Sequence, residues 1–136
     1  MLSLKKVHSI ALSNNGYNML TAGADGELHL LDLRKPNGNS VTLAAPKGKG
    51  KKGKATSAYT SCAFDSSGAF CIGGTAEGVV RVWKTKGASF VKELSGSHSK
   101  AVTAVAAGFE AEARGGDEKT FVASCSLDRS LKFFAL

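Results

Sequence analysis

The sequence predicts an all-β protein built from three copies of one unit, and two observations carry this prediction. The first is a repeated stretch in which small residues lead into an acidic turn and then into an alternating strand: AGADGELHLLDLRK, GGTAEGVVRVWKTK and SCSLDRSLKFFAL. Within it, Glu77 follows Asp25 by 52 positions and Asp128 follows Glu77 by 51. The second is the regular alternation of apolar residues between turn signals, which is typical of short antiparallel strands. A repeat of this length decides the architecture, so we interpret the chain unit by unit.

The first unit spans about residues 7–45 and is expected to hold four strands. Asn and Gly in SNNG tolerate the backbone angles of a turn, and Asp25-Gly26 is a strong hairpin signal. Pro36-Asn37-Gly38 turns the chain again before a short outer strand. The strands are expected at residues 7–12, 17–24, 27–34 and 40–44.

The second unit, about residues 59–94, repeats this order, and the third, about residues 101–136, stops after its third strand. The only tryptophan, Trp83, lies on the third strand of the second unit, six positions after Glu77; Leu31 and Phe134 hold the same place in the other two. The strands are expected at residues 59–64, 69–76, 79–85, 89–94, 101–107, 120–126 and 130–136.

Two segments break the repeat pattern. Residues 45–57 are rich in Lys and Gly and contain no apolar periodicity, which predicts a disordered surface loop because such a segment cannot bury enough surface to offset its ordering. The loop carries much of the net charge of +7, since the count without five of its lysines is +2. The five lysines of this loop are Lys47, Lys49, Lys51, Lys52 and Lys54.

The second segment, residues 109–118, is predicted to form an exposed acidic hairpin loop.

The cysteines and the N-terminus point to an intracellular protein. Cys62, Cys71 and Cys125 have no metal-binding spacing and lie in predicted strands, which favours buried reduced thiols. We expect no signal peptide and no membrane span, because no apolar run is long enough. The composition therefore favours protein or nucleic-acid partners over a membrane.

The repeat has a physical consequence for packing. A small four-stranded sheet that is apolar on both faces needs a neighbour on each face, and this favours the radial stacking of blades in a β-propeller. Three units do not close a ring, because propellers use about four to eight blades. We therefore expect the remaining blades of the ring to belong to another polypeptide, and the family resemblance described next implies a ring of seven blades, of which this chain supplies three.

The repeated residues resemble the WD-repeat family over nearly the whole chain. The resemblance rests on the dipeptide Ser97-His98, the small residues before each turn, the acidic turn residue, and the large apolar residue six positions later. In that family, a loop His, a strand hydroxyl, the acidic turn residue and the tryptophan share a structural hydrogen-bonded network. The resemblance implies that His98 and Asp128 form such a network with Ser124 or Ser126, and that the second unit, which has no equivalent His, has an incomplete one. The implied structural residues are Asp25, Glu77, Trp83, His98, Ser124 and Asp128.

A finer resemblance concerns the ending SCSLDRSLKFFAL with the stretches SNNGYNMLTAGADGELHLLDLRK and FDSSGAFCIGGT. These are similar to the C-terminal blades of the pre-mRNA-processing factor nineteen family, the nuclear U-box ubiquitin ligases of the splicing machinery. The resemblance implies a partner- and substrate-binding propeller in a spliceosomal scaffold, in the ubiquitin-conjugation pathway and in the nucleus. It also implies that the parent protein oligomerises through a coiled coil and that the catalytic U-box is absent from these residues.

Two alternatives stay open. The chain could be part of a WD-repeat scaffold of another intracellular complex, without ubiquitin ligase activity. The Lys-rich loop could also contact RNA phosphates, an interaction that is electrostatic and tolerant of sequence. We predict no catalytic residues, no metal site and no cofactor: GKGKKGK lacks the spacing of a phosphate-binding loop, and the paired carboxylates lie only in the acidic loop.

Overall fold

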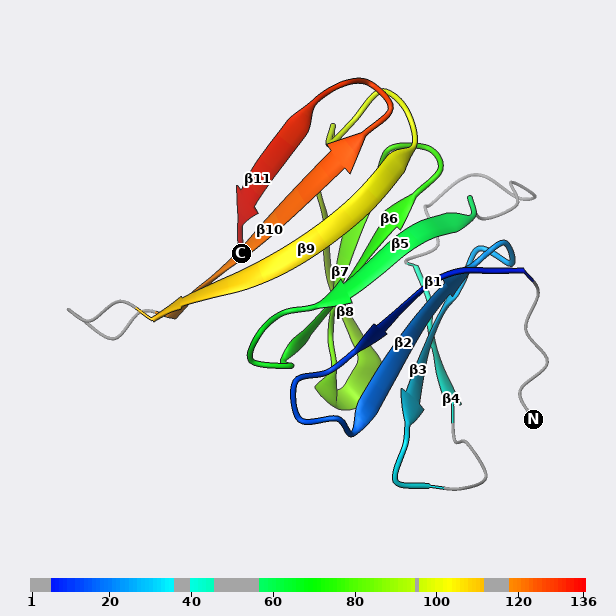
Figure 1. Cartoon of the computed structure of the whole chain (residues 1–136), viewed down its shortest axis with the longest axis vertical. Helices are drawn as coiled ribbons and strands as arrows, with labels where there is room; N and C mark the ends of the chain where they lie inside the picture. Colours follow the sequence, from blue (N-terminus) through cyan, green and yellow to red (C-terminus); the bar gives the residue numbers. More distant parts are fainter. Residues whose placement is uncertain (1–5, 36–39, 46–56, 95, 112–117) are drawn as a thin grey trace.

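A computed structural model describes residues 6–35, 40–45, 57–94, 96–111 and 118–136, and in them the chain forms three antiparallel sheets (Figure 1). The sheets follow one another along the sequence, and each is a meander in which consecutive strands pair. We call them blades 1, 2 and 3. Blade 1 contains β1 (Val7–Leu12), β2 (Asn18–Gly23), β3 (Leu28–Asp32) and β4 (Ser40–Leu43); blade 2 contains β5 (Tyr59–Phe64), β6 (Phe70–Thr75), β7 (Val80–Lys84) and β8 (Ser89–Leu94); blade 3 contains β9 (Val102–Ala111), β10 (Glu118–Ser126) and β11 (Leu131–Ala135).

The predicted order of strands and turns matches the structure closely. β1, β5 and β8 have the predicted bounds, and most other strands are one or two residues shorter than expected. A single turn of 3-10 helix, Lys86–Ala88, stands between β7 and β8 and was not predicted. It is three residues long, so the only helical segment among the described residues is far too short to cross a membrane.

The prediction of a loop over residues 109–118 was wrong at both ends. β9 runs on to Ala111 and β10 begins at Glu118, and the antiparallel register continues through the pair Glu110 and Lys119. The backbone hydrogen bonds of the hairpin therefore extend past the point where the acidic sequence begins, because ladder pairing does not depend on apolar side chains. Residues 112–117, like the basic segment 46–56, lie outside the described residues.

The three blades pack face against face, and the first strand of blade 2, β5, lies between the first strands of the other two, β1 and β9 (Figure 1). One apolar core lies between blades 1 and 2 and contains Leu20, Leu28, Tyr59 and Trp83, all nearly inaccessible. A second core lies between blades 2 and 3. Blade 2 is thus covered on both faces, as the sequence predicted for a sheet that is apolar on both sides; the second core contains Ile72, Val80, Val82, Leu94, Val102 and Val122.

Two glycines of β6 explain why small residues occur there. A Cβ atom on Gly73 would lie 2.6 Å from Leu28 Cδ1 of blade 1, and a Cβ atom on Gly74 would lie 2.5 Å from Val102 Cγ1 of blade 3. Both distances are far below van der Waals contact. The neighbouring blades therefore approach the middle strand of blade 2 so closely that only glycine fits on either side.

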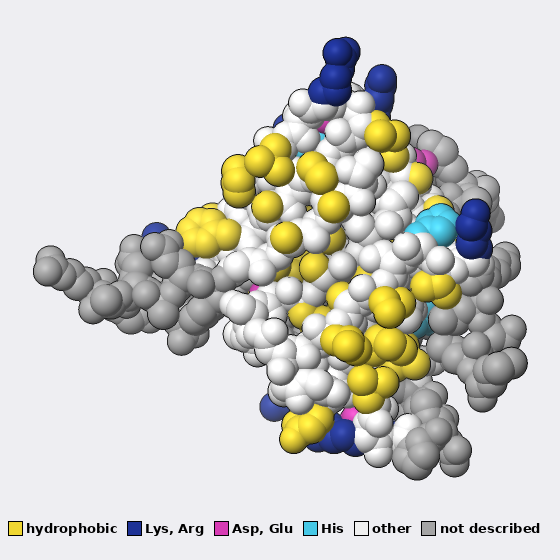
Figure 2. Space-filling view, in the orientation of Figure 1, with side chains coloured by type: hydrophobic (Ala, Val, Ile, Leu, Met, Phe, Trp, Pro, Cys, Tyr) yellow, Lys and Arg dark blue, Asp and Glu magenta, His cyan; other side chains and the backbone are white. Residues whose placement is uncertain are grey.

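Each end blade presents one open apolar face (Figure 2). On blade 1, Ile10 and Leu12 are 62% and 61% exposed, and on blade 3, Leu131 and Phe133 are 60% and 70% exposed. Leu131 and Phe133 occupy in β11 the places that Val80 and Val82 occupy in β7, where both valines are fully buried against blade 3. The open faces thus have the composition of the two internal interfaces.

Candidate functional site

Blade 3 contains the most complete polar cluster among the described residues. His98 comes from the connection between β8 and β9, and its side chain is fully buried. Its Nε2 lies 2.8 Å from Ser124 Oγ on β10, and its Nδ1 lies 3.1 Å from Asp128 Oδ2 in the β10–β11 turn and 2.9 Å from Ser130 Oγ. The structure therefore brings together the loop His, the strand hydroxyl and the turn carboxylate that the resemblance implied.

Asp128 organises the turn through its two carboxylate oxygens. Oδ1 accepts hydrogen bonds from the backbone N–H of Ser130 at 2.9 Å and from Ser130 Oγ at 2.5 Å, and Oδ2 accepts one from the backbone N–H of Ser99 at 3.1 Å. The hydrogen bond from the Ser130 hydroxyl, with those from the two backbone N–H groups and from His98, lowers the pKa of Asp128 well below its ordinary value. The carboxylate is thus held ionised and fixes the turn to the connection that enters blade 3.

The sequence left open whether Ser124 or Ser126 contacts the imidazole, and the structure places Ser124 there. Ser126 instead donates to the backbone oxygen of Ala101 at 2.8 Å and accepts from the backbone N–H of Asp128 at 3.1 Å. The pairing of β10 with β9 is irregular between Cys125 and Ser126. Such an irregularity redirects the following side chain, which explains why Ser126 does not reach the imidazole.

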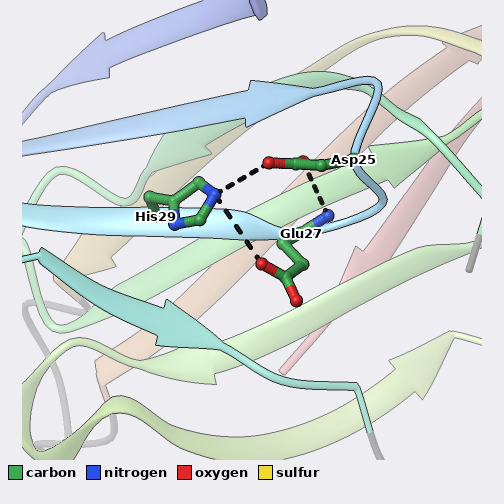
Figure 3. Close-up of side chains that lie close together, drawn as sticks. All are labelled: Asp25, Glu27 and His29. Carbon is green, nitrogen blue, oxygen red and sulfur yellow. Dashed lines mark hydrogen bonds and ion pairs between the residues drawn. The ribbon is translucent and has the colours of Figure 1, made fainter. Parts of the chain in front are cut away.

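Blade 1 has a different arrangement around its turn (Figure 3). His29 reaches back from β3, and its Nε2 lies 3.0 Å from Asp25 Oδ2 in the β2–β3 turn and 3.9 Å from Glu27 Oε2. Burial alone would raise the pKa of Asp25, but the hydrogen bonds from His29 and from the backbone N–H of Glu27 outweigh it, so the pKa is lowered. His29 lies within the strand predicted over residues 27–34, and its spacing of four from the acidic turn residue Asp25 was the sequence signal for this contact.

The polar cluster of blade 1 is incomplete at Thr21 on β2. Thr21 pairs with His29 across the strands, as Ser124 pairs with Lys132 in blade 3. Its hydroxyl is buried, and no hydrogen-bond partner lies within reach among the described residues. In blade 1 the imidazole thus comes from the adjacent strand and contacts the carboxylate, but the strand hydroxyl is left without the contact that Ser124 makes.

The ligand atoms of Asp25, Glu27 and His29 all lie within 4.8 Å of one another, so these residues are the group among those described that could offer three donors to a metal ion. The direct hydrogen bond between His29 and Asp25 accounts for their closeness. Half of the Glu27 side chain is exposed, which places the third donor at the edge of the group. The hydrogen bonds that Asp25 accepts from the backbone N–H of Glu27 and shares with His29 tie the cluster to the hairpin.

Blade 2 lacks the His, as the sequence predicted, and Gly73 stands where blade 3 has Ser124, so the strand hydroxyl is missing as well. Glu77 is exposed at its turn, and Thr75 supports the turn instead, since Thr75 Oγ1 accepts from the backbone N–H of Val79 at 3.1 Å. Trp83 is fully buried and donates from Nε1 to the backbone oxygen of Ala44 at 3.2 Å, which ties blade 2 to blade 1. Its ring centroid lies 6.1 Å from that of Tyr59 and 5.8 Å from that of Phe90, both edge-on.

Among the described residues, His8, Cys62 and Cys71 take part in hydrogen bonding and packing. His8 lies 3.1 Å from the backbone oxygen of Tyr59. Cys62 and Cys71 are buried and not paired with each other across β5 and β6, and burial raises the pKa of each thiol to about 11. The lysines proposed for nucleic-acid contact lie outside the described residues: Lys47, Lys49, Lys51, Lys52 and Lys54.

Comparisons with known proteins fit this geometry. The family model of the WD domain, G-beta repeat, matches residues 50–84. Human Protein Atg16l2 is 28% identical over 101 residues, which is 74% of this chain and 15% of that protein. The crystal structure of the RRP9 WD40 repeats superposes with a TM-score of 0.66 at 13% identity, over 100% of this chain and 40% of that chain.

The three sheets are blades of a WD-repeat β-propeller. The predicted fold class is thereby confirmed, and the predicted resemblance is confirmed as far as the WD repeat. The chain spans less than half the length of each of these two relatives. The resemblance to splicing-complex ligases stays a prediction.

Proposed function

We propose that this chain is the protein-binding part of a WD-repeat scaffold and performs no catalysis itself. The observation that carries this proposal is the use of the buried polar groups. His98 bonds to Ser124 and Asp128, and Asp128 bonds to the turn backbone. In blade 1, His29 bonds to the Asp25 carboxylate and, at 3.4 Å, to Thr42 Oγ1. Both histidine–carboxylate–hydroxyl sets among the described residues therefore hold a hairpin together. The exposed surface of the blades is then the feature left for function, and propellers characteristically bind other proteins through their surfaces.

The open faces of blades 1 and 3 require partners of a definite kind. Their exposed Ile, Leu and Phe side chains match residues that are buried between the described blades. Contiguous apolar surface of this kind is unfavourable in water. We infer that further propeller blades cover both faces in the working protein, and our expectation from the sequence is that another polypeptide supplies them.

The finer proposal is a role in pre-mRNA splicing. The similarity of residues 124–136 to the last blade of the pre-mRNA-processing factor nineteen family supports a nuclear scaffold that recognises spliceosomal partners or ubiquitination substrates. The ligase chemistry would then belong to a U-box elsewhere in the assembly. Blade 3 and its turn would serve as part of the recognition surface.

A co-purification experiment tests both levels. The full-length gene product, tagged and purified from nuclear extract, is expected to carry splicing proteins and to build ubiquitin chains when mixed with activating and conjugating enzymes. Specific protein partners without splicing factors or ubiquitin chains would favour a WD-repeat scaffold of another complex. Absence of any specific protein partner would overturn the proposed function.

A second candidate function is RNA contact through the basic segment, favoured by the five lysines within residues 47–54. Each lysine–phosphate contact releases counterions, so RNA affinity should fall steeply with salt. Changing all five lysines to glutamine is expected to remove most of this salt dependence. Unchanged RNA affinity in that variant would exclude the segment as the binding element.

A further inference from the structure

Blade 1 differs from the other two blades at the second and fourth positions after the acidic turn residue. These positions are Glu27 and His29 in blade 1, Val79 and Arg81 in blade 2, and Ser130 and Lys132 in blade 3. In blades 2 and 3 the cation bonds to neighbouring residues: Arg81 Nε donates to Glu93 Oε2 at 2.8 Å, and Lys132 Nζ donates to the backbone oxygen of Gly96 at 3.0 Å. His29 instead turns toward the acidic residues of its own hairpin (Figure 3).

Two carboxylates of blade 1 converge on one ring nitrogen. Asp25 Oδ2 lies 3.0 Å and Glu27 Oε2 lies 3.9 Å from His29 Nε2. Nε2 carries at most one proton, which serves the nearer carboxylate, and 3.9 Å is too long for a hydrogen bond. Among the described residues, both carboxylates form their ion pairs with this imidazole. A divalent cation at the same point would meet all three groups and balance both negative charges.

The hydroxyl of Thr21 is an independent sign that a polar ligand belongs here. Thr21 is 4% exposed, and its hydroxyl has no hydrogen-bond partner among the described residues. Thr21 pairs directly with His29 across β2 and β3, so the two side chains project from the same face of the sheet. A buried hydroxyl without a partner is unfavourable. In blade 3 the equivalent Ser124 bonds to an imidazole, whereas in blade 1 a metal-bound water would supply the missing partner.

The spacing of the donors suits a first-row divalent ion. The three ligand atoms lie within 4.8 Å of one another. Zn²⁺ binds His nitrogen and carboxylate oxygen at about 2.0–2.2 Å, so a tetrahedral ion holds its ligands about 3.4 Å apart. The separations of 3.0 and 3.9 Å lie on either side of this value, and the half-exposed Glu27 side chain is free to close the difference. A donor set of one nitrogen and two oxygens favours zinc over calcium or magnesium, which prefer oxygen alone.

We propose that Asp25, Glu27 and His29 bind a zinc ion, with His29 coordinating through Nε2 and water completing the tetrahedron. The imidazole then carries its proton on Nδ1, which lies 3.4 Å from Thr42 Oγ1, and an outer contact of this kind orients a zinc-binding histidine. The ion would cross-link the β2–β3 turn to β3, a property beyond the proposed protein-binding function. It replaces the expectation from the sequence that the chain has no metal site.

The site does not require the open face of blade 1 to be free. The donors converge on one another, and the side chains of His29 and Asp25 are already only 12% and 18% exposed. A blade that covered this face would exclude water from the site and strengthen the attraction between the ion and its carboxylates.

Isothermal titration of zinc chloride into the full-length protein, first stripped of metal with a chelator, tests the proposal. Glu27→Gln removes one ligand at a half-exposed position and should lower zinc affinity at least about tenfold, since changes to outer contacts alone cost about 10–100-fold. His29→Asn should lower it at least as much. Glu93→Gln, which removes a carboxylate that pairs with Arg81 in blade 2, is the matched control and should leave zinc affinity unchanged.

Cobalt(II) reports the coordination directly, because tetrahedral cobalt absorbs visible light far more strongly than octahedral cobalt. The wild type and Glu93→Gln should gain this absorption, and Glu27→Gln should not. Thermal unfolding separates ligation from folding: without metal, Glu27→Gln should melt with the wild type, because its carboxylate lies beyond hydrogen-bond distance of His29. Added zinc should raise the melting temperature of the wild type alone.

The proposal is overturned if the wild type binds no zinc, or if zinc binds the wild type and Glu27→Gln with equal affinity. Loss of affinity in His29→Asn alone would also overturn it, because the carboxylates would then not be ligands. Equal competition by magnesium or calcium would reduce the binding to general attraction of cations and overturn it too. Each of these results leaves the protein-binding function standing, since co-purification of partners tests that function separately.

Discussion

Blades 2 and 3 show two different ways of stabilising the same sheet. Blade 2 is covered on both faces and is centred on Trp83, which is fully buried between Tyr59 and Phe90, while its turn has neither the buried His nor the strand hydroxyl. Blade 3 is covered on one face, and Phe134 replaces the tryptophan as a half-buried side chain. It compensates with the polar network of His98, Ser124 and Asp128. Apolar burial therefore dominates in the middle of the assembly, and hydrogen bonding gains weight where a face is open.

The largest expected effect tests the apolar side of this comparison. Trp83→Ala should lower the free energy of unfolding by about 3–5 kcal/mol, because it empties a buried site and breaks the tie to Ala44. Phe134→Ala, at the equivalent position of blade 3, should cost roughly 1–2 kcal/mol, since its ring is only half-buried. Urea unfolding monitored by circular dichroism measures both. Equal losses would mean that the two blades depend on apolar burial alike.

The next effect tests the close approach of the blades. Gly74→Ala should cost about 1–3 kcal/mol, because the new Cβ would meet Val102 of blade 3 at 2.5 Å. Gly108→Ala on β9 is the matched control: nothing lies within 4 Å of its Cβ position, and alanine should stabilise the strand by roughly 0.5–1 kcal/mol. Urea midpoints of the two variants should therefore move in opposite directions, and a shift in the same direction would contradict the packing described here.

The polar networks of the two end blades should differ in strength. His98→Ala leaves Ser124 and Asp128 without their buried partner and should cost about 1–3 kcal/mol. His29→Ala removes the hydrogen bond to the partly exposed carboxylate of Asp25 and a longer one, at 3.4 Å, to Thr42 Oγ1, and should cost about 0.5–1.5 kcal/mol. Urea unfolding of both variants checks the order. A larger loss for His29→Ala would show that the cluster of blade 1 contributes more than its exposure suggests.

Much of this comparison could be predicted from the sequence, because the repeat places equivalent residues in equivalent positions. The repeat spacing predicts the structural positions of Trp83, of the acidic turn residues and of the Ser97-His98 dipeptide. The choice of Ser124 over Ser126 could not, because it depends on an irregularity of pairing between Cys125 and Ser126. The contact of His29 with Asp25 was also not predicted, because a place in an alternating strand pattern does not show which side chain a residue will contact. The need for glycine at positions 73 and 74 arises only when two other blades approach from opposite sides.

The smallest effect concerns acid stability and separates the two acidic turns. A carboxyl group whose pKa is lowered by folding contributes stability that is full above its ordinary value, here 3.8, and is lost as the pH falls from there toward the folded-state pKa. Asp128 has a strongly lowered pKa and Asp25 a less strongly lowered one. Wild-type stability should therefore decline below about pH 4, and Asp128→Asn should flatten this decline more than Asp25→Asn. Urea midpoints at pH 7, 5 and 3 measure the slopes. Parallel slopes for the wild type and Asp128→Asn would mean that folding does not lower the pKa of Asp128, so the hydrogen bonds to its carboxylate would add no net stability. Blade 3 would then owe its stability to apolar burial, as blade 2 does.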